Sequence, residues 1–221
     1  MQRHEAIKHS AKTLSQYLRN TYAQVSLIDK LKIVYRPYIC PLGQLLEYAK
    51  FSKNVFDVGC GSGQFLLLLA HFGGMEKLGG IEISERLISN ARKLLANPGR
   101  SALFLAVFDG KTIPAQINEY DWVTMIDVFH HIPPEEQIPF MMALHKAMKP
   151  GAVLIFKDIN QNSPLVLINK FHDAVLGGGA GREISAKKAE IMLTEIGFRI
   201  GTITTQTTLA YPHYTIVCKK T

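Results

Sequence analysis

The amino-acid sequence predicts an α/β fold: a three-layer sandwich around a mostly parallel sheet of seven strands, with an antiparallel hairpin at its end. Between residues 55 and 196, short apolar runs alternate with helical segments, and this order is typical of crossover units in a parallel sheet. The first apolar run leads into a turn with three glycines and then into an apolar helix. A loop of only a few residues joins the last two strand-like runs, so we expect them to pair as a hairpin.

The individual elements follow from local signals. Ser84 is a typical N-cap, and Glu135 and Glu136 suit the positive end of a helix dipole. Pro and Gly at 98–99 and 150–151 end two helices, and the glycines at 177–181 indicate a flexible loop. The expected strands are 55–58, 78–83, 102–107, 122–126, 153–156, 198–207 and 214–219, and the expected helices are 64–72, 85–95, 134–148 and 186–196.

The first fifty residues are expected to be helical and then irregular. Ile7, Ala11, Leu14 and Leu18 fall on one helical face. Prolines at 37 and 41 are expected to break helix around the segment between them. This stretch is either a cap packed on the core or a lid over a ligand.

Composition limits the class of protein. The chain has 221 residues, of which 47% are hydrophobic and 19% charged, which fits one globular domain with a sizeable core. The formal net charge of +7 favours an anionic partner: an acidic substrate, a lipid surface or nucleic acid. The basic residues are scattered and form no block with aromatic residues, so a small molecule is favoured over nucleic acid.

Three cysteines, Cys40, Cys60 and Cys218, lie far apart and have no metal-ligand spacing, so we expect reduced thiols and no metal site. The first residues lack the apolar core of a signal peptide, and no apolar run approaches the roughly 20 residues that span a bilayer. These features indicate a cytoplasmic protein.

The glycine turn reads Asp57-x-Gly59-x-Gly61-x-Gly63. Gln64 stands where a dinucleotide-binding fingerprint needs its third glycine, which argues against a nicotinamide enzyme, and there is no P-loop. The turn could be an ordinary glycine-rich connection between strand and helix. Its spacing, however, resembles the first motif of the class I S-adenosylmethionine-dependent methyltransferases, whose Rossmann-like fold also ends in an antiparallel hairpin.

The resemblance implies that S-adenosylmethionine is the cofactor and S-adenosylhomocysteine the product. Ligands of open α/β sheets bind beyond the carboxyl ends of the strands, where this chain places an acid after nearly every strand. Glu82 would accept from the ribose hydroxyls, or it is a helix-start acid; Asp109 would meet the adenine amino group, or it only caps a turn. Arg36 could meet the ligand carboxylate, or it is a solvated charge. The expected cofactor-binding residues are Arg36, Asp57, Gly59, Cys60, Gly61, Gly63, Glu82, Ile83, Phe108, Asp109, Gly110 and Asp127.

A second resemblance lies at residues 120–132, which end in Phe-His-His-Ile, as the corresponding strand does in many small-molecule methyltransferases. The Asn/Asp-Pro-Pro-aromatic sequence that the family uses for amino-group acceptors is missing, which lowers that substrate class. Methyl transfer to a hydroxyl must remove a proton, and histidine suits this task. His130 and His131 are therefore the candidate catalytic bases, although one of them could pack structurally while the other only shapes the pocket.

The stretch 163–176 is strongly apolar and lies where the family carries substrate-specific insertions, here about residues 160–184. It is either a core helix or a wall for a lipophilic acceptor, in which case the protein would contact a membrane peripherally. Arg182 and Glu183 would close over it.

These observations predict a helical cap or lid at residues 1–50 and a methyltransferase domain at 51–221. The expected function is methyl transfer to a hydroxyl oxygen or an activated carbon of a small hydrophobic or aromatic acceptor. The rivals are an RNA or protein methyltransferase, which the missing amino-group motif disfavours, and a non-catalytic protein that binds the cofactor for a partner.

Overall fold

The computed structural model describes residues 9–21, 27–96, 102–160, 183–209 and 211–221. The expectations for the glycine-rich stretch 177–181, the apolar stretch 163–176, the helix stop at 97–99, Ile7 and Arg182 lie outside these residues.

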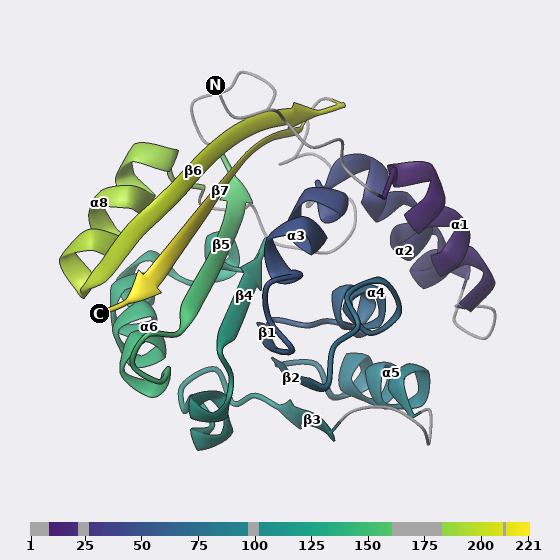
Figure 1. Ribbon diagram of the computed structural model, residues 1–221, viewed down its shortest axis with the longest axis horizontal. Helices are drawn as coiled ribbons and strands as arrows, with labels where there is room; N and C mark the ends of the chain where they lie inside the picture. The colour runs from purple at the N-terminus through teal and green to yellow at the C-terminus, as the bar shows by residue number, and fades with distance from the viewer. Residues whose placement is uncertain (1–8, 22–26, 97–101, 161–182, 210) are drawn as a thin grey trace.

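A single seven-stranded sheet runs through the middle of the molecule in the order β3-β2-β1-β4-β5-β7-β6 (Figure 1). The five strands β1 to β5 pair in parallel and β7 runs antiparallel to both of its neighbours, which confirms the predicted fold. The strands are β1 Asn54–Val58, β2 Lys77–Glu82, β3 Ala102–Val107, β4 Trp122–Ile126, β5 Val153–Ile159, β6 Phe198–Thr208 and β7 Tyr211–Lys220.

Helices cover both faces of this sheet, and each face has its own apolar core. On one face α4 (Gln64–Phe72) and α5 (Glu85–Leu95) pack with the N-terminal helices, and on the other α6 (Pro134–Ala147) and α8 (Ala186–Ile196) pack with the short helix η1 (Ala115–Glu119). Figure 1 shows the two groups on opposite sides of the central strands. Strand order reverses between β1 and β4, and this switch point is where open α/β sheets bind ligands.

The N-terminal region is more helical than expected. It contains α1 (Ala11–Thr21), α2 (Leu27–Ile39) and α3 (Leu42–Ala49), so the predicted irregular stretch is wrong. Pro37 lies inside α2 and leaves the carbonyl of Ile33 without its usual N–H donor four residues on. The side-chain amide of Gln64 donates to that carbonyl at 2.7 Å and replaces the missing bond. Helix α2 therefore tolerates its proline because α4 supplies the donor.

Two strands extend at least three residues further than predicted. β7 begins at Tyr211 rather than at 214, so His213 is part of the strand and the hairpin connection is shorter than expected. β5 continues to Ile159, so Lys157 and Asp158 lie within the strand rather than at its end. Because side chains alternate along a strand, these two neighbours point to opposite faces of the sheet.

Candidate functional site

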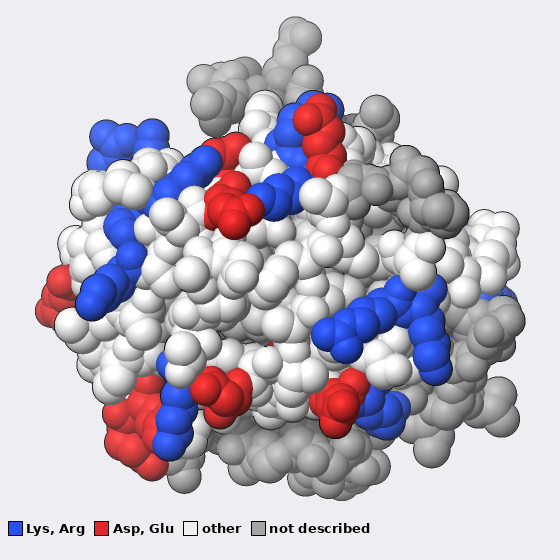
Figure 2. All heavy atoms as spheres, turned by 90° about the horizontal axis from the view of Figure 1, so that it is seen from below, with Lys and Arg blue, Asp and Glu red and all other residues white. Residues whose placement is uncertain are grey.

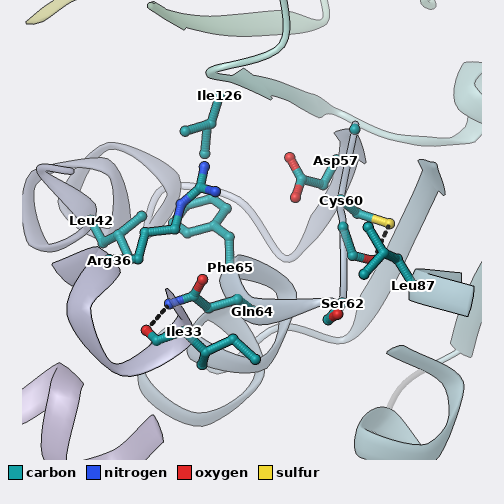
Figure 3. Close-up of a pocket in the computed structure, with 12 residues that line it drawn as sticks. Ile33, Arg36, Leu42, Asp57, Cys60, Ser62, Gln64, Phe65, Leu87 and Ile126 are labelled. Carbon is teal, nitrogen blue, oxygen red and sulfur yellow. Dashed lines mark hydrogen bonds between the residues drawn. The ribbon is translucent and has the colours of Figure 1, made fainter. Parts of the chain in front are cut away.

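A cavity of about 200 Å³ lies at the switch point, between the carboxyl ends of β1 and β4 and helix α2 (Figure 3). Its walls come from α2, the start of α3, the glycine turn, the start of α4 and the beginning of α5. The lining residues are Ile33, Arg36, Leu42, Asp57, Gly59, Cys60, Gly61, Ser62, Gln64, Phe65, Leu87 and Ile126.

The glycine turn forms one wall of this cavity and requires glycine for two different reasons. Gly59, Gly61 and Gly63 all have positive φ values, of 74°, 54° and 75°. A Cβ atom at Gly59 would lie 2.3 Å from Cγ2 of Val128, so side chains are also excluded there by packing. Gly63 does not line the cavity; it precedes α4, and a Cβ atom there would press on Ala91 of α5 at 3.0 Å.

Asp57 supplies the buried carboxylate of the cavity. It is the fourth residue of β1, is only 3% exposed, and accepts a hydrogen bond from the hydroxyl of Thr124 at 2.6 Å. Burial raises the pKa of Asp57 to about 7, although the Thr124 hydrogen bond and the charge of Arg36 act in the opposite direction. An ammonium group placed beside it would favour the ionised form.

Arg36 supplies the cation. Its guanidinium points from α2 into the cavity, across from the carboxylate of Asp57 (Figure 3). One guanidinium nitrogen lies 3.3 Å from a carboxylate oxygen of Asp127. The cavity therefore presents a cation and an anion on opposing walls, which matches the two charges of an amino acid.

Asp127 follows β4 with a φ of 56°, one of two positive values found among the described non-glycine residues. Its carboxylate also pairs with Lys157, whose side chain is fully buried. Burial alone would raise the pKa of Asp127, but the charges of Lys157 and Arg36 outweigh it and hold the pKa well below its usual range. Asp127 does not line the cavity; it contacts Arg36, which does.

Glu82 ends β2 next to the glycine turn. One carboxylate oxygen accepts the backbone N–H of Gly61 at 3.1 Å, and the other accepts that of Ser84 at 3.0 Å. Each oxygen keeps a further lone pair for a hydroxyl donor. Glu82 therefore shapes the turn and remains suited to a ribose.

The residues expected around an adenine are less closely assembled. Ile83 is 70% exposed at the rim. Phe108 packs edge-on against Phe140 of α6, with ring centroids 6.0 Å apart. One oxygen of Asp109 accepts the N–H groups of Lys111 and Thr112, which lower the pKa of Asp109. Gly110 takes a positive φ in the same turn.

The two histidines after β4 differ in their surroundings. Both belong to the short helix η2 (Phe129–His131), but His130 is only 3% exposed, whereas His131 is exposed. Nδ1 of His130 lies 2.5 Å from a carboxylate oxygen of Asp158, and the backbone N–H of His130 donates to the other oxygen at 3.1 Å. The two imidazole rings contact each other at 4.0 Å between centroids.

Several residues of the site had no clear signal in the sequence. In the sequence, Gln64 only argues against a dinucleotide-binding fingerprint, yet its side chain bonds α4 to α2 and lines the cavity. Thr124 and Phe65 look like ordinary strand and helix residues. The proline in α2 was the one available hint, because a helical proline leaves a carbonyl that some other donor must satisfy.

The observations fit S-adenosylmethionine. The opposed Arg36 and Asp57 match the carboxylate and ammonium of its methionine part, and the side-chain-free turn lets the ligand approach the backbone. Among the described residues, no group of three or more His, Cys, Asp or Glu side chains could hold a metal ion. The three cysteines are free and buried.

No helix in the described part of the chain is long and apolar enough to cross a membrane. Figure 2 shows Lys and Arg interspersed with Asp and Glu around one face of the molecule, with an uncharged centre. The described residues of this face form no continuous basic track of the kind that follows a nucleic-acid backbone.

A known family model matches the middle of the chain. Residues 55–151 match the family described as "Methyltransferase domain". Over 116 residues the chain is 30% identical to the ubiquinone biosynthesis O-methyltransferase of Thiobacillus denitrificans; the match covers 52% of this chain and 48% of that protein. The chain thus spans about half the length of these curated relatives. A carboxy-S-adenosyl-L-methionine synthase of Aliivibrio fischeri is 27% identical over 167 residues, 71% of this chain and 68% of the relative.

Solved structures share the fold over nearly the whole chain. An S-adenosylmethionine-dependent methyltransferase from Aquifex aeolicus superimposes with a TM-score of 0.67 at 18% identity, covering 94% of this chain and 98% of that one. The magnesium protoporphyrin IX methyltransferase of Synechocystis, solved with bound S-adenosylhomocysteine, gives a TM-score of 0.67 at 19% identity, with 93% and 94% covered.

Proposed function

We propose that the chain is a class I S-adenosylmethionine-dependent methyltransferase, which its match to a methyltransferase domain and its fold support. We propose further that it transfers a methyl group to a hydroxyl oxygen, or to an activated carbon, of a small hydrophobic or aromatic acceptor. The observation that carries this proposal is the cavity at the switch point, in which Arg36 faces Asp57 beside the glycine turn. The bound cofactor supplies an electrophilic methyl group on a positively charged sulfur. The protein then mainly has to align the acceptor with that methyl group.

The chain's own residues divide the cofactor between them. Asp57 holds the ammonium and Arg36 the carboxylate, while Glu82 accepts from the ribose hydroxyls with the oxygen lone pairs that the backbone leaves unused. Asp109 and Phe108 lie on the neighbouring strand end, where the adenine would follow. Leu87 and the exposed Ile83 cover one face of the adenine ring.

The acceptor binds beyond the end of β4, and His130 or His131 takes its proton. The relatives support an oxygen acceptor on a lipophilic molecule, since they include ubiquinone biosynthesis O-methyltransferases and a magnesium protoporphyrin IX methyltransferase. The acceptor of this chain would be reached at a membrane surface through peripheral contact.

The test combines binding with labelling. Calorimetry should show that the protein binds S-adenosylhomocysteine but not NAD, and that Glu82→Ala weakens this binding at least tenfold. Methyl-labelled S-adenosylmethionine, added with an extract of the native cell, should then place label in the lipid-soluble fraction. Mass spectrometry of the spent cofactor should find S-adenosylhomocysteine.

Three results would contradict the proposal. Label in RNA or protein would make the chain a macromolecular methyltransferase. A carboxylated cofactor would favour the reaction named for the Aliivibrio relative. Cofactor binding without any turnover would indicate a protein that carries the cofactor for a partner.

A further inference from the structure

The side chain of Asp158 forms a buried pair with His130 on the face of the sheet opposite Lys157. Both side chains are 2% exposed. Asp158 lies in β5 and His130 in the short helix after β4, so the pair joins two neighbouring strand ends at the edge of the sheet to which the proposed function assigns the acceptor.

Asp158 has its hydrogen bonds arranged for an acceptor-only side chain. One oxygen takes Nδ1 of His130 at 2.5 Å and the backbone N–H of Ile159 at 2.7 Å, and the other takes the backbone N–H of His130 at 3.1 Å. The two oxygens can accept from both backbone N–H groups and from Nδ1 when that nitrogen carries the ring proton. A buried carboxylate of this kind fixes both the position of the ring and the nitrogen that carries its proton.

We propose that Asp158 is a positioning residue that holds His130, rather than His131, as the general base of methyl transfer. The proposal rests on the proposed function of the site. The contact with Asp158 keeps the proton on Nδ1, so Nε2 carries the lone pair that accepts the acceptor's proton. At the exposed His131, by contrast, water competes with the acceptor for the ring nitrogens.

The proton and electron balance is complete without a further reactant. As the acceptor oxygen bonds to the methyl carbon, the carbon–sulfur bond breaks and its electron pair stays on sulfur. The hydroxyl proton passes to Nε2, and the resulting imidazolium is stabilised by the Asp158 carboxylate until the proton leaves to water. The buried surroundings strengthen this stabilisation because few solvent dipoles screen the pair.

Other groups face the pair from the adjacent elements. His131 contacts the ring of His130, and Tyr214 of β7 lies opposite Asp158 in the sheet. Gln137 of α6 donates to the carbonyls of Phe129 and Ile132 and so holds the turn in place. A pH profile alone would mix these contributions, so the first readout must be specific to His130.

Nitrogen-15 NMR of the cofactor-free protein reads the tautomer directly. We expect the Nδ1–H form of His130 in the wild-type protein. In Asp158→Asn the single remaining oxygen serves the backbone donors and the amide NH₂ faces Nδ1, so the ring should switch to the Nε2–H form. A wild-type Nε2–H form, or no change in the variant, would overturn the proposal.

Turnover of 4-tert-butylcatechol, a simple phenolic acceptor, supplies the second readout. His130→Ala should lower kcat on the order of 100-fold, and Asp158→Asn at least tenfold with KM for the acceptor unchanged. Asp121→Asn is the matched control, because this aspartate pairs with Lys149 at the other end of β4 and should leave kcat unchanged. Retained S-adenosylhomocysteine binding shows that each variant is folded.

The outcomes separate this proposal from the one on which it rests. If the wild-type protein transfers methyl groups but only His131→Ala abolishes transfer, the assignment of His130 is wrong and the proposed function stands. If the wild-type protein binds S-adenosylhomocysteine and methylates neither this catechol nor any compound of the cell extract, both are overturned.

Discussion

Replacing Gln64 by Leu should destabilise the protein because it removes the donor that satisfies the carbonyl of Ile33. Pro37 has no N–H to offer, and the amide of Gln64 donates at 2.7 Å instead. Leu has a similar volume and no donor, so the carbonyl stays buried without a partner, at a cost of about 1–3 kcal/mol. For a domain of this size, each kcal/mol lowers Tm by about 2–4 °C.

A double-mutant cycle isolates this effect. Pro37→Ala restores a backbone N–H in the right position of α2, so Gln64→Leu should cost much less in that background. Urea unfolding of the wild-type protein, both single variants and the double variant measures the coupling, which we expect to be about 1–2 kcal/mol. Equal costs of Gln64→Leu in both backgrounds would refute the explanation.

Three further predictions concern the cavity. Gly59→Ala should lower the free energy of unfolding by well over the roughly 1 kcal/mol that the positive φ alone costs, because its Cβ would overlap Val128. The Cβ of Gly61→Ala meets open space among the described atoms, so this variant should lose only that roughly 1 kcal/mol; urea unfolding measures both losses. Arg36→Gln should weaken S-adenosylhomocysteine binding at least tenfold in calorimetry and leave the binding of adenosine, which has no carboxylate, unchanged; equal losses for both ligands would contradict its role. S-adenosylhomocysteine affinity should rise as pH increases through about 7, because burial keeps Asp57 protonated below that pKa and only its carboxylate attracts the ammonium; Asp57→Asn should remove this pH dependence.

The sequence predicted those parts of the fold whose signals are local. The Ser84 cap accepts from the N–H of Leu87 as expected, the strands β3 and β4 have the predicted bounds, and the glycine turn lies where the spacing placed it. Each of these features depends on residues within a few positions of one another, so the pattern contains the information that the structure uses.

The features that the sequence did not predict depend on distant partners. The proline of α2 is tolerated only because a side chain 27 positions later supplies a donor. The start of β7 is set by its pairing with β6, where Thr208 lies opposite Tyr211, and the ladder with β5 begins two residues later at His213. For Arg36 the sequence left two readings open, a ligand contact or a solvated charge, and its place in the cavity depends on how α2 packs against distant strand ends.

Lys157 and Asp158 show how strand alternation divides the chemistry of this site. Side chains alternate along β5, so Lys157 contacts Asp127, which Arg36 also contacts, on the face of the cavity, whereas Asp158 contacts His130 on the other face. The two clusters are thus built by adjacent residues of β5 and meet at the end of β4. A one-residue shift of β5 would exchange them, placing a cation beside His130 and a carboxylate beside Asp127. The register of β5 therefore determines both the charge that lies next to Asp127 and the anion that pairs with His130.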